Sequence, residues 1–362
     1  MLNTSFLDAL AGKPTSYTPL WLMRQAGRYL PEYLKTRQLA GSFMDLAQNP
    51  SLATQVTLQP LDRYDLDAAI LFSDILTIPD AMGLGLHFIA GEGPKFNYPL
   101  QSEHSIKNLR TADMSKLQYV FDAVSSIIKA LRNNLTVQSQ RLPLIGFSGS
   151  PFTLACYMIE GSGSSNNFEY TRSIMYSRSD LFEHILEINT LSVIEYLSLQ
   201  IQAGVNAVMI FDTWGGLLSQ ANYIKYSLKY IQKIIKTLKE KYPHIPCIVF
   251  TKGGGVWLEQ ISAIQPDAIG VDWTIDIGKA RKIVPNSISL QGNLDPIVLR
   301  GSQENIIMQT KDMLDSYYSV NRNLSRYIAN LGHGISQHTN PENVAIFVDT
   351  LKDYSKTLIK LR

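Results

Sequence analysis

The chain of 362 residues is 45% hydrophobic and only 18% charged, which excludes a disordered or fibrous protein and predicts a large buried core. Its formal net charge of +2 provides no overall attraction to nucleic acid or to a membrane surface, so an anionic ligand would need a local cluster of cations. With two cysteines, no N-terminal secretory signal and no apolar run of about 18 residues, the sequence predicts a cytoplasmic protein without a disulfide framework or a membrane-spanning helix.

The first third of the chain contains several helical patterns around two apolar runs. Residues 3–11 predict a short helix that caps the fold before the first strand, and residues 34–48 and 50–60 predict two more helices. Glycines, prolines and alternating residues between Met82 and Leu100 predict a β-hairpin inserted after the second strand. Residues 113–135 have a strong helical period.

Eight apolar runs, most of them separated by helical patterns, end in polar residues or glycine. Continuous apolar runs are typical of parallel strands that are covered on both faces. The longer helices expected between or after the later runs cover 180–203, 219–241, 302–318 and 341–360. The eight runs are 18–22, 68–72, 142–147, 207–211, 246–250, 268–271, 288–290 and 327–329.

We therefore expect an α/β fold in which residues 1–362 form one domain, a (β/α)8 TIM barrel with a short N-terminal cap and the hairpin insertion. An open doubly wound sheet is the alternative, but no strand is followed by a Gly-x-Gly-x-x-Gly turn. In a barrel, the polar residues that end the runs would converge on the active face.

Two arginines follow the first predicted strand. Arg24 and Arg28 are four residues apart, so a helical turn would place both on one face. Their forked guanidinium groups suit paired carboxylates or phosphates. Solvated surface arginines are the alternative for this stretch alone.

Carboxylates end the second and fourth predicted strands. Asp74 could act as a base, stabilise developing positive charge or accept hydrogen bonds from substrate N–H groups. The alternative for Asp74 is an N-cap of the following turn. Asp212, which precedes Thr213 and a glycine-rich turn, fits a structural role as well as a catalytic one.

Two further features lie at predicted strand ends, and a third, Tyr157, lies where the helix after the third predicted strand begins. The phenol of Tyr157 could point into the barrel mouth or pack in the core, and His333 lies between two glycines that would expose its ring. The stretch 252–255, Lys-Gly-Gly-Gly, resembles an anion nest but lacks the spacing of a P-loop. No Cys-x-x-Cys, His-x-Cys or His-Glu-x-x-His pattern occurs, so we expect no metal site.

Together these motifs resemble the uroporphyrinogen decarboxylase family. The stretch Met-Arg-Gln-Ala-Gly-Arg-Tyr is specific by itself, and seven matching blocks keep their order along nearly the whole chain. The blocks are Trp21–Tyr33, Pro60–Pro79, Gly146–Gly161, Phe211–Gly216, Phe250–Gly255, Gln291–Pro296 and Asn330–Ile335.

The resemblance implies a single barrel, a homodimer whose two clefts face each other, and a reaction with no metal or organic cofactor. That reaction converts the four acetate arms of uroporphyrinogen III into the methyl groups of coproporphyrinogen III, releasing carbon dioxide, in haem biosynthesis. Once a ring carbon is protonated, the electron-rich pyrrole itself can accept the electrons that carbon dioxide leaves behind. The protein then supplies orientation and charge stabilisation.

The resemblance also implies roles for single residues. Arg24, Arg28 and Arg37 correspond to basic positions that bind carboxylates, and Asp74 to the aspartate that faces the pyrrole N–H groups. An arginine is too weak an acid to be the obvious proton donor, and Asp74 would need a raised pKa, so the donor stays open. The remaining cleft positions are Tyr157, Thr213 and His333, with Asp74, Arg24, Tyr157 and His333 expected to be catalytic.

Two other functions compete with this one. A methyl-group-transferring enzyme on a related barrel would need a zinc–thiolate site, for which the His-x-Cys pattern is missing. A non-catalytic tetrapyrrole carrier would not need the carboxylate of Asp74 facing a polyanion. The segment 336–340 departs from the family, where proline is more usual, and this affects the expected loop conformation.

Overall fold

The computed structural model describes residues 3–89, 93–133, 142–162 and 167–361. Expectations for residues 90–92 of the hairpin and for 134–135 at the end of a helix lie outside these described residues.

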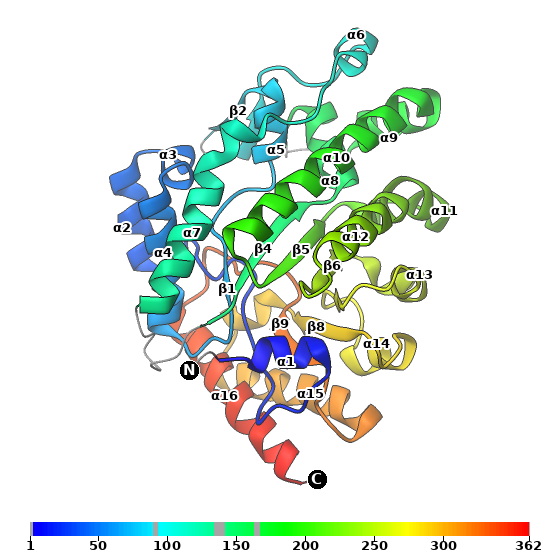
Figure 1. The fold of residues 1–362 in the computed structure, drawn as a ribbon. Helices are drawn as coiled ribbons and strands as arrows, with labels where there is room; N and C mark the ends of the chain where they lie inside the picture. Colours follow the sequence, from blue (N-terminus) through cyan, green and yellow to red (C-terminus); the bar gives the residue numbers. More distant parts are fainter. Residues whose placement is uncertain (1–2, 90–92, 134–141, 163–166, 362) are drawn as a thin grey trace.

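Seven parallel strands form one sheet in the order β1-β4-β5-β6-β7-β8-β9 (Figure 1). Strands that follow each other in this sheet are neighbours in space, as in a barrel, and they correspond to seven of the eight expected runs. Every residue of β4, β5 and β6 is buried, which explains why these runs are continuously apolar. The strands are β1 (Ala69–Ile70), β4 (Leu144–Gly149), β5 (Ala207–Asp212), β6 (Cys247–Thr251), β7 (Ala268–Gly270), β8 (Ser289–Leu294) and β9 (Tyr327–Leu331).

The eighth run, 18–22, forms a single parallel bridge between Leu20 and Ala329 in place of a regular strand. The amide of Ala329 donates to the carbonyl of Pro19 (2.8 Å), and on the other side the amide of Asp67 donates to the carbonyl of Leu20 (2.8 Å). This segment therefore joins β9 to the β1 edge and closes the barrel. It is not a full strand because Pro19 has no amide donor and the amide of Leu20 bonds the Asp67 carboxylate (2.9 Å).

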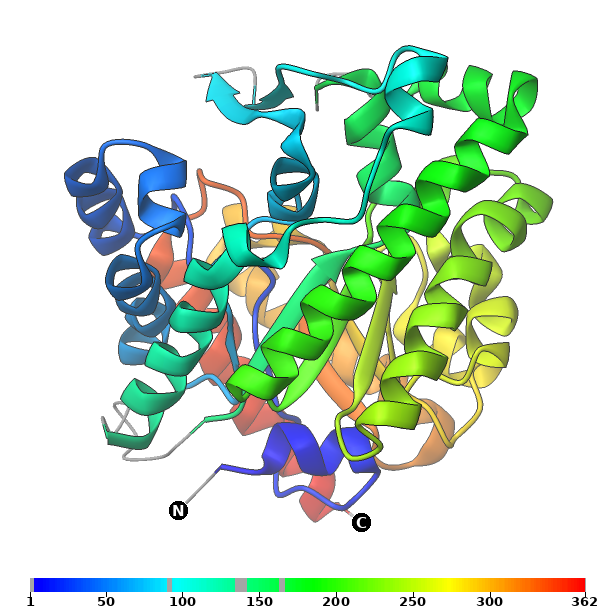
Figure 2. The same cartoon turned by 45° about the horizontal axis from the view of Figure 1, so that its top comes forward.

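Helices surround the sheet, and both termini lie at the end of the barrel where α1 packs (Figures 1 and 2). The expected helix 34–48 is divided at Gly41, which has φ +90°, and 219–241 is divided by a π-helical turn at Ile224–Leu228. The helices are α1 (Ser5–Ala11), α2 (Pro31–Ala40), α3 (Phe43–Ala47), α4 (Pro50–Arg63), α5 (Thr77–Pro79), α6 (Glu103–Lys107), α7 (Gln118–Asn133), α8 (Pro151–Glu160), α9 (Glu169–Ser177), α10 (Ser179–Ala203), α11 (Gln220–Tyr223), α12 (Lys229–Lys241), α13 (Leu258–Ala263), α14 (Ile277–Ile283), α15 (Gln303–Asn321) and α16 (Pro341–Lys360).

The expected hairpin after the second strand is present, as β2 (Leu86–Ile89) and the antiparallel β3 (Gly93–Phe96). The amide of Phe96 donates to the carbonyl of Gly161 (2.9 Å), and the amide of Leu100 donates to the carbonyl of Met158 (2.8 Å). The hairpin is thereby fixed against the C-terminal end of α8, on the side of the barrel opposite to the chain termini (Figure 2).

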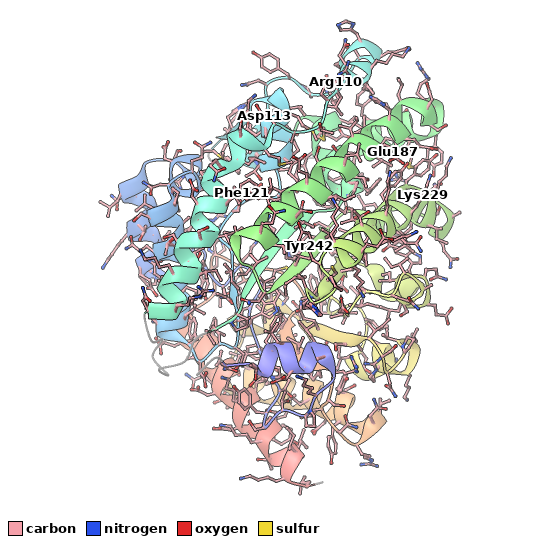
Figure 3. The ribbon with its side chains drawn as sticks, viewed as in Figure 1. Arg110, Asp113, Phe121, Glu187, Lys229 and Tyr242 are labelled. Carbon is pink, nitrogen blue, oxygen red and sulfur yellow. The ribbon has the colours of Figure 1, made fainter. Side chains whose placement is uncertain are left out.

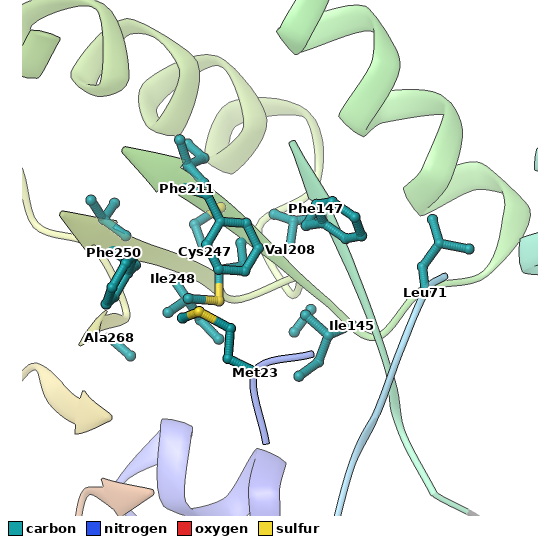
Figure 4. Close-up of a cluster of buried hydrophobic side chains, with 14 of the residues drawn as sticks. Met23, Leu71, Ile145, Phe147, Val208, Phe211, Cys247, Ile248, Phe250 and Ala268 are labelled. Atoms are coloured by element: carbon teal, nitrogen blue, oxygen red, sulfur yellow. The ribbon is translucent and has the colours of Figure 1, made fainter. Parts of the chain in front are cut away.

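Apolar side chains from the strands fill the barrel, and polar ones cover the outer helices. Ile145, Val208 and Ile248 pack together inside it (Figure 4). On the outside, Glu187 of α10 and Lys229 of α12 belong to the polar surface of the helical layer (Figure 3). Across the part of the chain that the structure describes, none of the helices has the length and apolar composition that crossing a membrane would require.

Candidate active site

The predicted site residues all follow the closing segment or a strand. Asp74 follows β1, Tyr157 lies in α8 after β4, Thr213 follows β5 and His333 follows β9. These are C-terminal ends of parallel strands, so the chain topology brings them to the same end of the barrel.

Arg24 lies at the centre of this group. Its positive charge acts on the pKa of Asp74, Tyr157 and His333, so all three lie within electrostatic range of its guanidinium group. The stretch after residue 23 forms turns where a helical turn was considered, and Arg24 itself has φ +62°. Arg24 is exposed and has no ion-pair or hydrogen-bond partner among the described residues, so its charge is available to an anion.

Gly334 provides the space that the Arg24 side chain occupies. A Cβ at position 334 would lie only 2.3 Å from Cδ of Arg24. At position 332 a Cβ would lie 2.6 Å from the backbone nitrogen of Trp273. The two glycines beside His333 are therefore required by close packing, which is a different reason from the exposed ring that the sequence suggested.

Asp74 is half-buried and has one oxygen engaged. Its Oδ1 accepts a hydrogen bond from the amide of Leu76 (2.8 Å), so the expected capping contact is present. The other oxygen makes no hydrogen bond within the described residues. Burial raises the pKa of Asp74, while the Leu76 amide and the positive charge of Arg24 act in the opposite direction. One carboxylate oxygen is thus left for a ligand.

His333 is a neutral imidazole at physiological pH. Burial, followed by the positive charges of Arg24 and Lys252, lowers the pKa of His333 to about 4, and Asp272 opposes this only in part. Its ring lies 6.1 Å from the ring of Phe250, measured between centroids.

Tyr157 forms part of an aromatic wall. Its ring packs against Trp214 (6.2 Å between centroids) and Phe168 (5.9 Å). Burial raises the pKa of Tyr157 to about 12, so the phenol stays protonated and can donate a hydrogen bond. Thr213, which is half-buried, immediately precedes Trp214 and so lies beside this wall.

Arg28 and Arg37 form a second cationic position beside Tyr33. Both charges lower the pKa of Tyr33, against the larger raising effect of burial. The Tyr33 ring in turn lies 5.8 Å from that of Phe72, two residues before Asp74. Arg28 is exposed without an ion pair in the described chain, and Arg37 donates to the carbonyl of Gly41 (2.8 Å).

Three phenylalanines that the sequence analysis treated only as strand residues form a row of rings across the inside of the barrel. Phe147 packs on Phe211 (5.6 Å), and Phe211 on Phe250 (6.1 Å), each edge to face. Figure 4 shows the three side chains over the apolar interior. Phe250 extends the row to His333. The sequence contains a sign of this row, because each of the three apolar runs has phenylalanine at its end. Only the closed barrel shows that the three rings lie side by side, and we call them the phenylalanine floor.

Asp212 belongs to the framework of the barrel. It is fully buried and accepts hydrogen bonds from four hydroxyl groups, so its oxygens have no room for a substrate. The donors are Ser150 (2.5 Å), Ser227 (2.7 Å), Thr153 (3.3 Å) and Thr251 (3.4 Å).

Comparison with known proteins assigns the family. The sequence profile of the family "Uroporphyrinogen decarboxylase (URO-D)" matches residues 1–354. The chain belongs to the uroporphyrinogen decarboxylase family. Proteins named uroporphyrinogen decarboxylase include one from Cupriavidus metallidurans, 57% identical over 98% of this chain and 96% of that protein. Others are from Azoarcus sp. (54% identical; 98% and 97%) and Neisseria meningitidis serogroup C (56%; 98% and 97%).

Solved structures extend the family assignment to the fold. A methyltransferase from Methanosarcina mazei superposes with a TM-score of 0.78 at 19% identity, covering 97% of this chain and 98% of that one. A B12-independent methionine synthase from Shewanella sp. W3-18-1 gives a TM-score of 0.54 at 9% identity, covering 95% of each chain. At these identities the likeness supports the α/β barrel of this uroporphyrinogen decarboxylase family member and carries no information on its reaction.

Acidic, histidine and cysteine side chains are the usual ligands of metal ions in proteins. Among the residues that the structure describes, no three of these side chains form a group that could hold a metal ion. Cys156 and Cys247 are both buried free thiols.

Proposed function

We infer that this protein decarboxylates uroporphyrinogen, converting its acetate side chains into methyl groups in haem biosynthesis. The observation that carries the inference is that Asp74 and Arg24 lie near each other at the barrel mouth of a chain in this family. Asp74 is half-buried and has one carboxylate oxygen without a hydrogen bond, and Arg24 has no ion-pair partner among the described residues. Such a site suits a molecule that presents both N–H donors and carboxylates.

Binding of the substrate is the task of the arginines. Uroporphyrinogen has carboxylates around its edge, and Arg24 and Arg28 offer guanidinium groups that no described carboxylate occupies. Each charge-assisted hydrogen bond is worth roughly 1.5–3 kcal/mol. Arg37, on the same side near Tyr33, supplies a further positive charge. The phenylalanine floor excludes water beneath the macrocycle and strengthens these charge interactions.

The chemistry uses the pyrrole as its own electron acceptor. Protonation of a ring carbon gives a cation; the bond between the acetate methylene and its carboxylate then breaks, and the electron pair passes into the ring as carbon dioxide leaves. A second proton converts the methylene into a methyl group while the ring carbon releases its proton. We propose that the free oxygen of Asp74 accepts hydrogen bonds from the pyrrole N–H groups and that its negative charge stabilises this cation.

Tyr157 and His333 complete the site. With its pKa near 12, Tyr157 offers a hydroxyl donor to a carboxylate, whereas His333, with a pKa of about 4, is a neutral ring that offers one donor and one acceptor. Thr213 supplies a further hydroxyl beside the aromatic wall.

The competing functions have weaker support. The methyltransferase hypothesis is supported only by a similar fold at 19% sequence identity. The relatives that are more than 50% identical to this chain are named decarboxylases. A carrier would gain nothing from the partly desolvated carboxylate of Asp74, which costs affinity for a polyanion.

Four further points belong to this proposal. We propose that residues 1–362 act as one catalytic domain, supported by a single hydrophobic core that extends from Phe6 to Leu358. A homodimer is supported by exposed apolar side chains near the mouth: Val256, Trp273 and Ile297. The cytoplasm suits the two free thiols. The reaction needs no organic cofactor or metal because the pyrrole accepts the electrons.

Product analysis tests the function directly. Anaerobic incubation with uroporphyrinogen III should give coproporphyrinogen III and four carbon dioxide molecules per macrocycle, with activity unchanged by a chelator. Recovery of unchanged octacarboxylate, or zinc-dependent transfer of a methyl group, would refute the proposal.

A further inference from the structure

Lys252 lies across the barrel mouth from the arginines. It follows β6, and the segment 18–23 that leads into Arg24 completes the ring of strands. From this segment to β6 there are four steps through β1, β4 and β5, and four steps through β9, β8 and β7. The two positions are therefore opposite each other on the ring.

The backbone around Lys252 is held rigidly at this point. A Cβ at Gly216 would lie 2.1 Å from the carbonyl oxygen of Lys252, so the loop after β5 packs directly on the lysine backbone. On the other side, the amide of Gly253 donates to the carboxylate of Asp272. The glycines that the sequence suggested as an anion nest thus fix the base of the lysine, and the Gly253 amide is already occupied.

The Lys252 side chain has no anion of its own among the described residues. It is half-buried, and its ammonium group makes no hydrogen bond or ion pair with any residue that the structure describes. Its charge reaches His333, where it adds to that of Arg24. The nearby Asp272 is already engaged by Gly253 and Thr274. Arg24 and Lys252 are two unpaired cations, within the described chain, that both act on His333, and they repel each other unless an anion lies between them.

We propose that Lys252 is a substrate-positioning residue that binds a carboxylate on the edge of the macrocycle opposite to the edge held by Arg24 and Arg28. The inference rests on the proposed function, because a broad molecule with carboxylates around its whole edge needs cations on both sides of the mouth. Arg24 and Lys252 together then fix which acetate faces Asp74, since they hold the ring from two directions.

The test compares Lys252→Met, which removes the charge and keeps the length, with Lys252→Arg, which keeps the charge. Lys236→Met serves as the matched control, since Lys236 is an exposed residue of α12. For each protein the experiment measures KM and kcat with uroporphyrinogen III, equilibrium binding of the oxidised octacarboxylate uroporphyrin, the dependence of binding on salt, and the thermal midpoint.

Lys252→Met should raise KM and weaken binding of the octacarboxylate by roughly tenfold to a hundredfold. Its binding should depend less on salt than that of the wild type, its thermal midpoint should be unchanged, and Lys252→Arg should recover most of the affinity. Wild-type affinity and salt dependence in Lys252→Met would overturn the proposal for Lys252 while leaving the decarboxylase intact. Binding that depends on Lys252 in a protein that releases no carbon dioxide would refute the proposed function alone. Should the methionine variant not fold, Lys252→Gln replaces it with the same expected losses.

Discussion

At the scale of single residues, the charged groups differ in whether their hydrogen-bonding capacity is already used. Asp212 accepts four hydroxyl donors, and Asp272 is held by Gly253 and Thr274. Asp74 keeps a free oxygen, and Arg24 has no partner in the described chain. Sequence position alone cannot separate Asp74 from Asp212, because both follow an apolar run and the donors to Asp212 come from three separate segments. The distinction is a property of the folded site.

The lowered pKa of His333 predicts how the stability of the fold depends on pH. The pKa of this residue is about 4 in the folded protein and near the ordinary 6.5 when unfolded. Between these values the unfolded state binds more protons, so acidification from about pH 6.5 to about pH 4 should destabilise the fold, by at most about 3.5 kcal/mol at about 1.4 kcal/mol per pKa unit. Above pH 6.5 the residue contributes no pH dependence.

Urea unfolding of the wild type and of His333→Asn at pH 7 and pH 5 measures this contribution. The variant should lose less stability than the wild type on acidification, and the imidazole resonances of His333 should remain those of the neutral ring at pH 5. A ring that titrates near pH 6.5 would show that His333 is neither buried nor affected by the charges of Arg24 and Lys252.

At the scale of elements, strand ends and loops hold the functional side chains, and the close packing of Gly334 on Arg24 is the most direct example. Gly334→Ala should keep the fold, because the arginine side chain can move away from the new Cβ, which would otherwise lie 2.3 Å from Cδ. The displaced guanidinium should lower kcat/KM by about a hundredfold, the order expected for a shift of about 1 Å. Gly301→Ala, whose Cβ would lie no nearer than 3.1 Å to other atoms, is the control. Equal activity in both variants would mean that Arg24 is not held by this contact.

The closing segment depends on Asp67 at the opposite end of the barrel. This buried carboxylate accepts hydrogen bonds from the Leu20 amide (2.9 Å), the Tyr17 hydroxyl (2.6 Å) and Asn3 (3.0 Å), and it pairs with Lys352 (3.5 Å). In Asp67→Asn an amide group replaces one acceptor oxygen, so at least one of these buried donors loses its partner at a cost of about 1–3 kcal/mol, while Lys352 keeps its ion pair with Asp65.

Asp67→Asn should therefore lower the urea midpoint strongly with little change in the m-value. The control Asp353→Asn changes a carboxylate that is 81% exposed, and its midpoint should stay near that of the wild type. A wild-type midpoint in Asp67→Asn would show that the segment 18–22 is held by its main-chain contacts alone.

At the scale of the whole molecule, the sequence predicted most of the fold because a parallel barrel leaves a clear pattern. Continuous apolar runs gave seven strands, and helices such as 341–360 were placed at their observed bounds. The run 18–22 resembled the others but forms only a bridge, since its amides bond side chains such as that of Ser355 as well as Asp67. The sequence was less able to predict which side chains meet at the barrel mouth. The phenylalanine floor and the position of Lys252 opposite Arg24 depend on how the strands close into a barrel, and no local sequence pattern contains this information.

We propose that the free carboxylate oxygen of Asp74 stabilises the pyrrole cation while the arginines hold the substrate. Asp74→Asn keeps the size and removes the charge, and losing one such preorganised interaction costs about 2.7–4 kcal/mol, or roughly a hundredfold to a thousandfold in rate. The decisive measurement is the single-turnover rate of carbon dioxide release by the wild type and Asp74→Asn, alongside the binding constant for uroporphyrinogen III. We expect a rate lowered by that factor with a binding constant changed far less. An Asn variant that releases carbon dioxide at the wild-type rate would reduce Asp74 to the cap of Leu76 and contradict the mechanism.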